Sequence, residues 1–281
     1  MISNREKYFE LVKLNNEYLP KNVIYDLLVL VNGFSHVNEL ILNFDKDLIN
    51  EELLNNYVKD IISGKPYQYV INESIFCGLK LYVDENVLIP RPETEELSIL
   101  AKEKILQIFK NKNSLKIADV CTGSGCIGLA LFDGLKDKFE LNTYLTDISF
   151  EALEVAKKNV TKHGFNIEIL QGNLLEPIIG KNIKLDVIIS NPPYIPSKDT
   201  VAKETLEYEP HLALFATPSY KFYEEIFIQS KYCLADDGVL FFEIGEDMEE
   251  DLRKLTAKYF PNKDVKFLKD MYTKTRFLFI I

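Results

Sequence analysis

Four residues, Asn191, Pro192, Pro193 and Tyr194, carry the most chemical information in this chain. They follow the apolar run 187–190, which is typical of a buried strand. Two prolines hold a rigid corner there, at the strand end where open α/β sheets bind ligands. The Asn191 amide oxygen and the Pro192 carbonyl can both accept hydrogen bonds from one planar NH2 group, and the Tyr194 ring can cover its face. The corner predicts a site for a neutral amide or an exocyclic amine.

A glycine-rich turn forms a second candidate site, after the strand predicted at 117–120. Gly123, Gly125 and Gly128 match the GxGxxG pattern, and glycines let a ligand approach the backbone closely. Asp147 ends the next predicted strand, about where a ribose-binding acid is expected. The match alone is weak evidence for a dinucleotide site.

The charge of Asp119 separates two classes of cofactor. A pyrophosphate near this strand-end carboxylate would cost roughly 4 kcal/mol at ~4 Å in an effective dielectric of about 20. S-adenosylmethionine carries an ammonium and a sulfonium group, which a carboxylate attracts. We therefore expect S-adenosylmethionine, with Asp147 binding its ribose hydroxyls. Each acid could instead be a solvated strand-end residue or a helix cap, and Asn173 could contact the adenine edge or belong to a plain turn.

The composition argues against several other functions. With 33 basic and 43 acidic residues, the net charge of −10 disfavours nucleic acid as a direct partner. We expect no membrane span and no signal peptide, and therefore a cytoplasmic protein. The cysteines lack metal-site spacing, so we expect no metal site and free thiols. These cysteines are Cys77, Cys121, Cys126 and Cys233.

The pattern of apolar residues predicts a helical N-terminal part and a C-terminal α/β part. Residues 1–63 have helical spacing, whereas 66–90 read as strands with a turn at 84–86. Alternating strands and helices from about 115 predict a mostly parallel, doubly wound sheet whose last strand is antiparallel. The strands are expected at 117–120, 143–146, 167–170, 185–190, 238–244, 264–268 and 274–281. Helices are expected from about 127, at 149–163, at 219–234 and just before the strand at 264–268. A loop is expected at 195–218.

From about residue 20 onward, the chain resembles the HemK/PrmC-type protein N(5)-glutamine methyltransferases, which modify the Gly-Gly-Gln motif of peptide chain release factors. The corner at 191–194 is shared with enzymes that methylate amino groups in DNA, but its combination with 88–95 is far more specific. The motifs that carry the resemblance are 64–70, 76–79, 87–95, 191–195, 208–210, 213–214, 242–245, 269–270 and Arg276.

The resemblance implies three parts. These are a helical domain at 1–64 that helps dock the release factor, a β-hairpin linker at 65–90, and a methyltransferase domain at 91–281. The last is expected to contain a seven-stranded, Rossmann-like class I methyltransferase sheet. The resemblance also implies S-adenosylmethionine as cofactor, a release factor as protein substrate and a role in translation termination. We further expect a monomer.

The resemblance also assigns site residues. Asn191, Pro192 and Tyr194 are expected to be catalytic, and Arg91 and Pro193 to join them in binding the substrate glutamine. The expected cofactor-binding residues are Asp119, Cys121, Thr122, Gly123, Ser124, Gly125, Asp147, Asn173, Leu174 and Asn191.

Three positions depart from the family pattern. Cys121 stands where the family usually has glycine, a change we expect to be tolerated if the backbone there needs no positive φ. Asn72 also replaces a usual glycine, and asparagine tolerates the left-handed region. The stretch 215–220 lacks the family's usual glycine pair, which affects a loop on the substrate side.

The expected mechanism is methyl transfer to a positioned amide nitrogen without an obvious general base. The nearest rivals are an adenine acceptor, which would require a basic face and base flipping, and a glutamine in a ribosomal protein. A catalytically silent scaffold is a third possibility, and a dehydrogenase a fourth. Binding of S-adenosylmethionine but not NADH would exclude both of these.

Overall fold

The structure, a computed structural model, describes residues 2–281. The chain divides into a helical unit that ends at Asn72 and an α/β unit over Glu73–Ile281. The division falls after the helical residues 67–71, and the predicted hairpin belongs to the second unit rather than forming a separate linker. Within residues 2–281, no helix is both long and apolar enough to cross a membrane.

The helical unit packs around its own apolar core. Leu27, Leu28 and Leu54 are fully buried in it, and Ser3 begins the first helix with a reciprocal capping box. Its helices are α1 (Asn4–Lys13), α2 (Lys21–Val31), α3 (Val37–Leu42), α4 (Glu51–Ile62) and α5 (Tyr67–Ile71).

The strand predicted around Tyr67, Tyr69 and Ile71 is wrong, because these residues form helix α5. Pro66 precedes the first turn with a φ of −53°, which suits a helix start. Asn72 ends the helix in the left-handed conformation, with a φ of 52°, as expected for asparagine in place of glycine. An alternating pattern of only five residues could not outweigh these two end signals.

The predicted hairpin is shorter than expected. It pairs β1 (Ser74–Phe76) with β2 (Leu79–Leu81) across Cys77 and Gly78, which both have positive φ. Such a pair of residues suits a two-residue hairpin turn. The turn predicted at 84–86 is present, since the Val87 N–H donates to the Asp84 carbonyl at 3.1 Å.

The α/β unit contains one seven-stranded sheet, in agreement with the predicted fold. The strand order is β5-β4-β3-β6-β7-β9-β8, and all neighbours are parallel except those of β9. The antiparallel hairpin at the C-terminus is therefore confirmed. The strands are β3 (Ser114–Val120), β4 (Glu140–Asp147), β5 (Ile167–Gln171), β6 (Leu185–Ser190), β7 (Leu234–Glu243), β8 (Val265–Lys269) and β9 (Thr275–Ile280).

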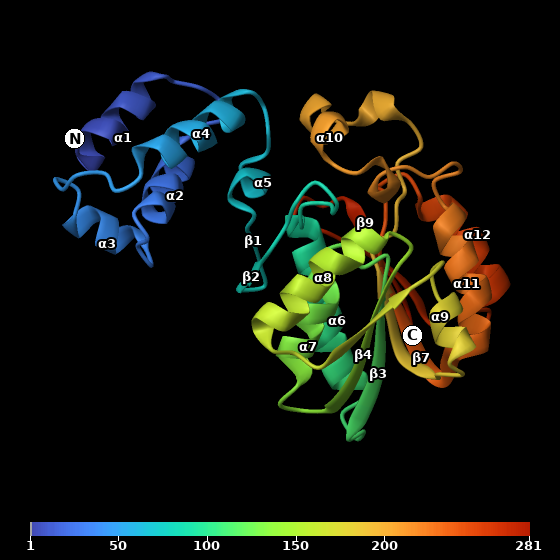
Figure 1. Ribbon diagram of the computed structural model, residues 1–281. Coiled ribbons are helices and arrows are strands. Elements are labelled where there is room, and N and C mark those ends of the chain that lie inside the picture. The colour runs from blue at the N-terminus through green and yellow to red at the C-terminus, as the bar shows by residue number, and fades with distance from the viewer. Residues whose placement is uncertain (1) are drawn as a thin grey trace. The chain divides into compact units, whose positions relative to one another are not determined.

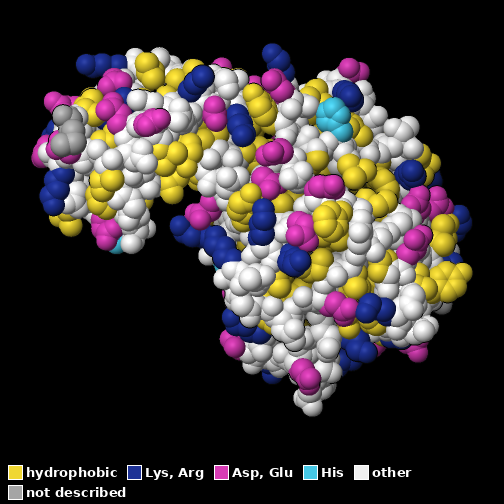
Figure 2. All heavy atoms as spheres, viewed as in Figure 1, with side chains coloured by type: hydrophobic (Ala, Val, Ile, Leu, Met, Phe, Trp, Pro, Cys, Tyr) yellow, Lys and Arg dark blue, Asp and Glu magenta, His cyan; other side chains and the backbone are white. Residues whose placement is uncertain are grey.

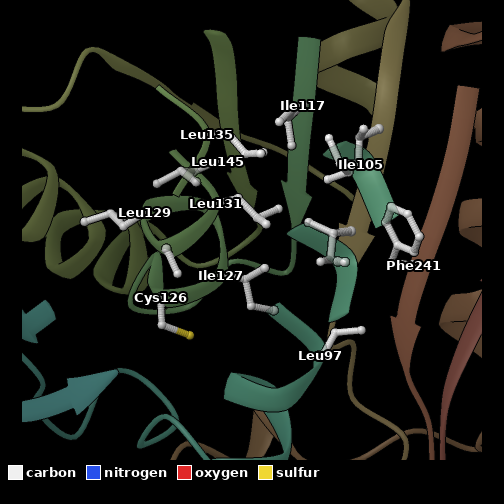
Figure 3. Packing of buried hydrophobic residues seen from close by; sticks show 14 of the residues in the cluster. Leu97, Ile105, Ile117, Cys126, Ile127, Leu129, Leu131, Leu135, Leu145 and Phe241 are labelled. Atoms are coloured by element: carbon white, nitrogen blue, oxygen red, sulfur yellow. The ribbon is translucent and has the colours of Figure 1, made fainter. Parts of the chain in front are cut away.

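Helices cover both faces of this sheet (Figure 1). Successive strand residues enter opposite cores: Ile117 packs with the first three helices, whereas Ala118 packs with the last three. Figure 3 shows the first core, in which Leu97 and Phe241 also lie. The first three helices are α6 (Pro92–Ile108), α7 (Cys126–Leu135) and α8 (Phe150–His163), and the last three are α9 (Glu176–Gly180), α11 (Lys221–Cys233) and α12 (Glu249–Tyr259).

The segment 195–218 is more ordered than the predicted loop. It contains α10 (Lys203–Tyr208) and two short 3₁₀ helices, Lys198–Thr200 and His211–Ala213. Each helix is too short to give a periodic apolar signal, and α10 buries none of its residues. Pattern analysis therefore could not detect them.

Candidate functional site

A cavity of about 470 Å³ lies at the carboxyl ends of the parallel strands. Its volume is in the range of small-molecule sites. The segments that follow β3, β4, β5 and β6 each contribute to its wall. Eight of the ten expected cofactor residues line it: Cys121, Thr122, Gly123, Ser124, Asp147, Asn173, Leu174 and Asn191.

Asp147 ties two of these segments together. One of its oxygens accepts a hydrogen bond from the Gly123 N–H at 3.0 Å, and the other accepts one from the Ser149 N–H at 3.0 Å. Burial raises the pKa of Asp147. Each oxygen can accept a further hydrogen bond, and Asp147 lines the cavity, so the position suits ribose hydroxyls.

Asp119 lies beneath the glycine turn rather than in the cavity, which corrects its expected placement. It is fully buried, and one oxygen accepts hydrogen bonds from Thr122 Oγ1 at 2.6 Å and the Gly128 N–H at 2.9 Å. Its other oxygen has no hydrogen-bond partner among residues 2–281. Burial raises the pKa of Asp119 to about 7. Asp119 therefore holds the turn in place from below.

Gly125 also lies outside the cavity lining. It precedes α7 with a φ of 83°, which favours glycine. Cys121, by contrast, lines the cavity with a φ of 58°. The condition on which Cys121 was expected to be tolerated is thus not met, because the backbone at this position does adopt positive φ.

A second cavity of about 120 Å³ adjoins the first. Pro192, Tyr194 and Glu243 contribute to its lining but not to that of the larger cavity, whereas Pro193 lines the larger one. The residues that line both cavities are Leu88, Arg91, Asn191 and Ala213. The proline corner therefore separates a larger chamber next to the glycine turn from a smaller one next to Tyr194.

The amide of Asn191 has a fixed partner on one side only. Its Nδ2 donates to Thr94 Oγ1 at 3.0 Å. Within residues 2–281, neither Asn191 Oδ1 nor the Pro192 carbonyl accepts a hydrogen bond. The two acceptors predicted from the sequence are thus both available to a ligand.

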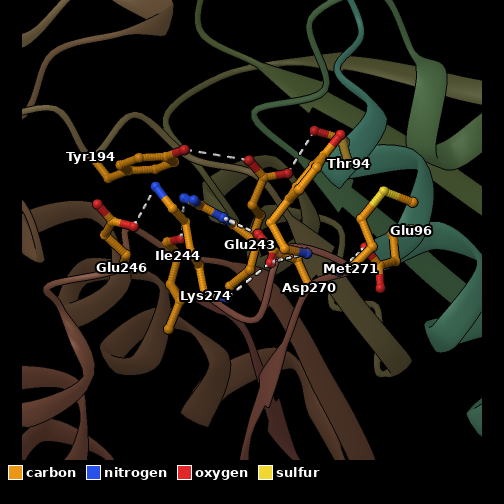
Figure 4. Close-up of polar contacts among 11 residues, drawn as sticks. Thr94, Glu96, Tyr194, Glu243, Ile244, Glu246, Asp270, Met271 and Lys274 are labelled. Carbon is orange, nitrogen blue, oxygen red and sulfur yellow. Dashed lines mark hydrogen bonds and ion pairs between the residues drawn. The ribbon is translucent and has the colours of Figure 1, made fainter.

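Two residues of this site were missed by sequence reasoning, namely Thr94 and Glu243. Both lie within motifs that carry the family resemblance, 87–95 and 242–245, but neither was assigned a role in the site. The signal for Glu243 is an acidic residue in an otherwise apolar run at 239–244. It is buried, and its oxygens accept hydrogen bonds from the Thr94 and Tyr194 hydroxyls (Figure 4).

Arg91 is not a free surface cation. It pairs with Glu209, which is buried and also accepts a hydrogen bond from the Ile89 N–H at 3.1 Å. This carboxylate joins the segment before α6 to the segment after α10, and both of these segments line the cavities.

The lining suits S-adenosylmethionine better than a phosphate-bearing cofactor. Two carboxylates, those of Asp147 and Glu225, line the larger cavity. The cationic residues in its lining are Arg91, which is already paired with Glu209, and Lys221. Among the described residues, His, Cys, Asp and Glu side chains do not gather in groups of three that could hold a metal ion.

Comparison with solved structures supports the fold. The hMettl16 catalytic domain in complex with MAT2A 3'UTR hairpin 1 has a TM-score of 0.57 at 16% identity, covering 85% of this chain and 83% of that chain. The ribosomal protein L11 methylase from Lactobacillus delbrueckii subsp. bulgaricus has a TM-score of 0.50 at 20% identity, covering 71% of this chain and 83% of that chain. At these identities the likeness concerns the methyltransferase fold alone.

Sequence comparison identifies the family. A model of the methyltransferase small domain matches residues 100–211. The release factor glutamine methyltransferase of Flavobacterium psychrophilum is 38% identical over 247 residues, covering 85% of this chain and 84% of that protein. Its counterpart from Leptospira interrogans is 37% identical over 286 aligned residues, covering 96% of each. With the proline corner and the glycine turn meeting at one cavity, the chain belongs to the release factor glutamine methyltransferase family.

Proposed function

We propose that this protein methylates the side-chain amide nitrogen of the glutamine in the Gly-Gly-Gln motif of peptide chain release factors and so modulates translation termination. One observation carries the proposal: the corner at 191–194 presents two unpaired acceptors where the two cavities meet. Relatives named for this activity, of which the chain covers 84% and 96%, support it.

The larger cavity is where the cofactor would be held. The backbone and side chains of residues 121–124, the Asp147 carboxylate and the Asn173 amide would contact S-adenosylmethionine there. When bound, S-adenosylmethionine supplies a methyl group activated by its sulfonium. The cavity lining contributes hydroxyl, thiol, amide and carboxylate groups, and such groups can hold a cationic nucleoside without a phosphate site.

The smaller cavity is where the substrate amide would lie. An amide nitrogen is a weak nucleophile because its lone pair is delocalised. Asn191 Oδ1 and the Pro192 carbonyl would each accept one of its N–H bonds, while Tyr194 covers its face. Fixing a nucleophile in this way can lower a barrier by several kcal/mol, up to about 7–11 in the best cases.

The partner and the setting complete the proposal. The helical unit over residues 2–72 would dock the release factor, and the protein would act as a monomer. Lys and Arg side chains are interspersed with Asp and Glu on the face shown in Figure 2, and the net charge is −10, which supports a protein substrate rather than direct nucleic-acid binding. A cytoplasmic location follows from a release factor substrate.

Labelled S-adenosylmethionine and a purified release factor test the proposal directly. We expect label on the release factor, and no label when the glutamine of its Gly-Gly-Gln motif is replaced by alanine. Label that persists on the replaced factor would reject the glutamine assignment. Label on a ribosomal protein instead, with none on the release factor, would identify a different acceptor.

The same assay tests the role of Asn191. Asn191→Ala should lower kcat at least ~100-fold, because the acceptor for one N–H of the substrate is lost. Its affinity for S-adenosylmethionine, measured by calorimetry, should stay close to that of the unaltered protein. An unchanged kcat would contradict the role of Asn191.

A further inference from the structure

Glu243 is a buried carboxylate that stands directly beside the proline corner. Strands β6 and β7 pair in parallel with Ser190 opposite Phe242, so Asn191 and Glu243 leave adjacent strands at the same level. Only 3% of Glu243 is exposed, and it lines the smaller cavity. A buried carboxylate at this point requires an explanation, because burial disfavours its charge.

The hydrogen bonds of Glu243 lead to Asn191 through one hydroxyl group. Thr94 Oγ1 donates to Glu243 Oε2 at 2.6 Å, and Asn191 Nδ2 donates to Thr94 Oγ1 at 3.0 Å. The Tyr194 hydroxyl donates to Glu243 Oε1 at 3.4 Å (Figure 4). Thr94 is only 2% exposed, so water cannot easily replace either partner.

The chemistry of these groups fixes the direction of each bond. An ionised carboxylate can only accept, so the single Thr94 hydroxyl proton is committed to Glu243. Because the Thr94 oxygen can then only accept, the Asn191 amide can bond to it only through its NH2 end. The amide of Asn191 is therefore held with Oδ1 directed away from Thr94.

We propose that Glu243 and Thr94 are positioning residues that fix the orientation of the Asn191 amide, so that it presents an acceptor and not a donor to the substrate NH2. This rests on the proposed function. The reversed orientation would present a second NH2 group to the substrate, and two donors cannot form a hydrogen bond with each other.

Protonation of Glu243 would remove this control. A carboxylic acid can donate to Thr94, whose hydroxyl can then donate to Asn191 Oδ1 and reverse the amide. Burial raises the pKa of Glu243 to about 7, so this change lies in an accessible range. The titratable and charged groups that interact with Glu243 from the neighbouring elements are Glu93 on α6, Cys126 on α7, Tyr194 after β6, Tyr223 on α11 and Arg276 on β9.

Glu243→Gln tests the proposal with almost no change in shape. We expect kcat for the release factor to fall about 100-fold, as for other losses of alignment, while affinity for S-adenosylmethionine changes less than about 2-fold. In the unaltered protein kcat should fall as pH drops through about 7. In the variant this decline of kcat at low pH, the acidic limb of the pH profile, should be absent, since a glutamine does not titrate there. A purely structural role would not remove a pH limb.

Thr94 provides a second pair of variants. Thr94→Val removes the hydroxyl at nearly constant volume and should lower kcat as much as Glu243→Gln. Thr94→Ser restores the hydroxyl and should recover most of the activity. The double variant Thr94→Val with Glu243→Gln should be no slower than either single one, because both break the same chain of bonds.

Glu246→Gln is the matched control. Glu246 lies three residues further on, is exposed, pairs with Lys274 and does not line either cavity, so its kcat should be unchanged. Equal kcat and the same pH limb in Glu243→Gln and the unaltered protein would overturn the proposal. If Glu243→Gln does not fold, equal rates for Thr94→Val and Thr94→Ser would overturn it. An unaltered protein that labels no release factor would instead reject the proposed function.

Discussion

Cys121 has a backbone conformation that glycine adopts without strain, with a φ of 58° at the edge of the cofactor cavity. A side chain with a Cβ costs roughly 1–2 kcal/mol in this region, because the Cβ approaches the following carbonyl oxygen. Cys121 is thus a point at which this chain gives up stability within its binding site.

The strain at Cys121 predicts an order of stability between two variants that both lack the thiol. Cys121→Gly should be more stable than Cys121→Ala by about 0.5–1 kcal/mol. This difference is the backbone strain that glycine relieves, minus the cost of the extra entropy that glycine gives the unfolded state. Urea unfolding gives the two free energies. At Cys126, the first residue of helix α7, the order should reverse, because its φ is not positive and glycine there only adds entropy to the unfolded state. The same order at both positions would refute the assignment of strain.

The two strand-end acids show how far residue roles can be predicted from sequence. Asp147 lines the cavity as expected, because it is the last residue of its strand. Asp119 does not, because α7 packs tightly against it: a Cβ on Gly128 would lie 3.2 Å from the Asp119 Cβ and 2.2 Å from Leu145 Cδ2. The sequence pattern places both acids at strand ends, but such packing decides which of them faces the ligand.

At the scale of elements, one carboxylate holds two cavity walls together. Glu209, between α10 and the second 3₁₀ helix, pairs with Arg91 at the start of α6 and accepts from the Ile89 N–H. These segments are far apart in the sequence, and neither has enough regular structure to be rigid alone. The ion pair therefore fixes the wall that both cavities share.

Arg91→Ala should destabilise the protein by about 1–3 kcal/mol, because it leaves the buried Glu209 with too few partners. The estimate stays well below that for a fully buried pair, since 36% of the Arg91 side chain is exposed. Chemical denaturation measures the difference. Arg5→Ala breaks the exposed pair with Asp45 and should cost less than about 1 kcal/mol. Equal losses for the two variants would mean that Glu209 does not depend on Arg91.

The elements themselves were predictable where they are long and periodic. Every strand of the seven-stranded sheet was expected close to its observed position, and α8 agrees with the helix expected at 149–163. The errors fall on short segments, namely α5 and the helices within 195–218. There the end signals at Pro66 and Asn72, or contacts with distant residues such as that of Glu209, decide the structure.

The whole molecule consists of two units, each with its own hydrophobic core. The residues that line the larger cavity all lie between Asn86 and Glu225, within the second unit. A chain without the helical unit would therefore retain all of these lining residues. In the proposed function, that unit contributes recognition of the release factor.

A chain that begins at Glu73 separates these two roles. We expect it to fold and to bind S-adenosylmethionine with nearly the affinity of the full chain, because every lining residue is retained. Its kcat/KM for the intact release factor should fall at least ~10-fold, equivalent to about 1.4 kcal/mol of lost docking energy. A short peptide with the Gly-Gly-Gln motif is the control, since it is too small to span a separate docking site, and both chains should methylate it equally. If the shortened chain methylated the intact factor as efficiently as the full chain, the helical unit would have no docking role. If the shortened chain also lost activity on the peptide, the helical unit would be needed for the chemistry.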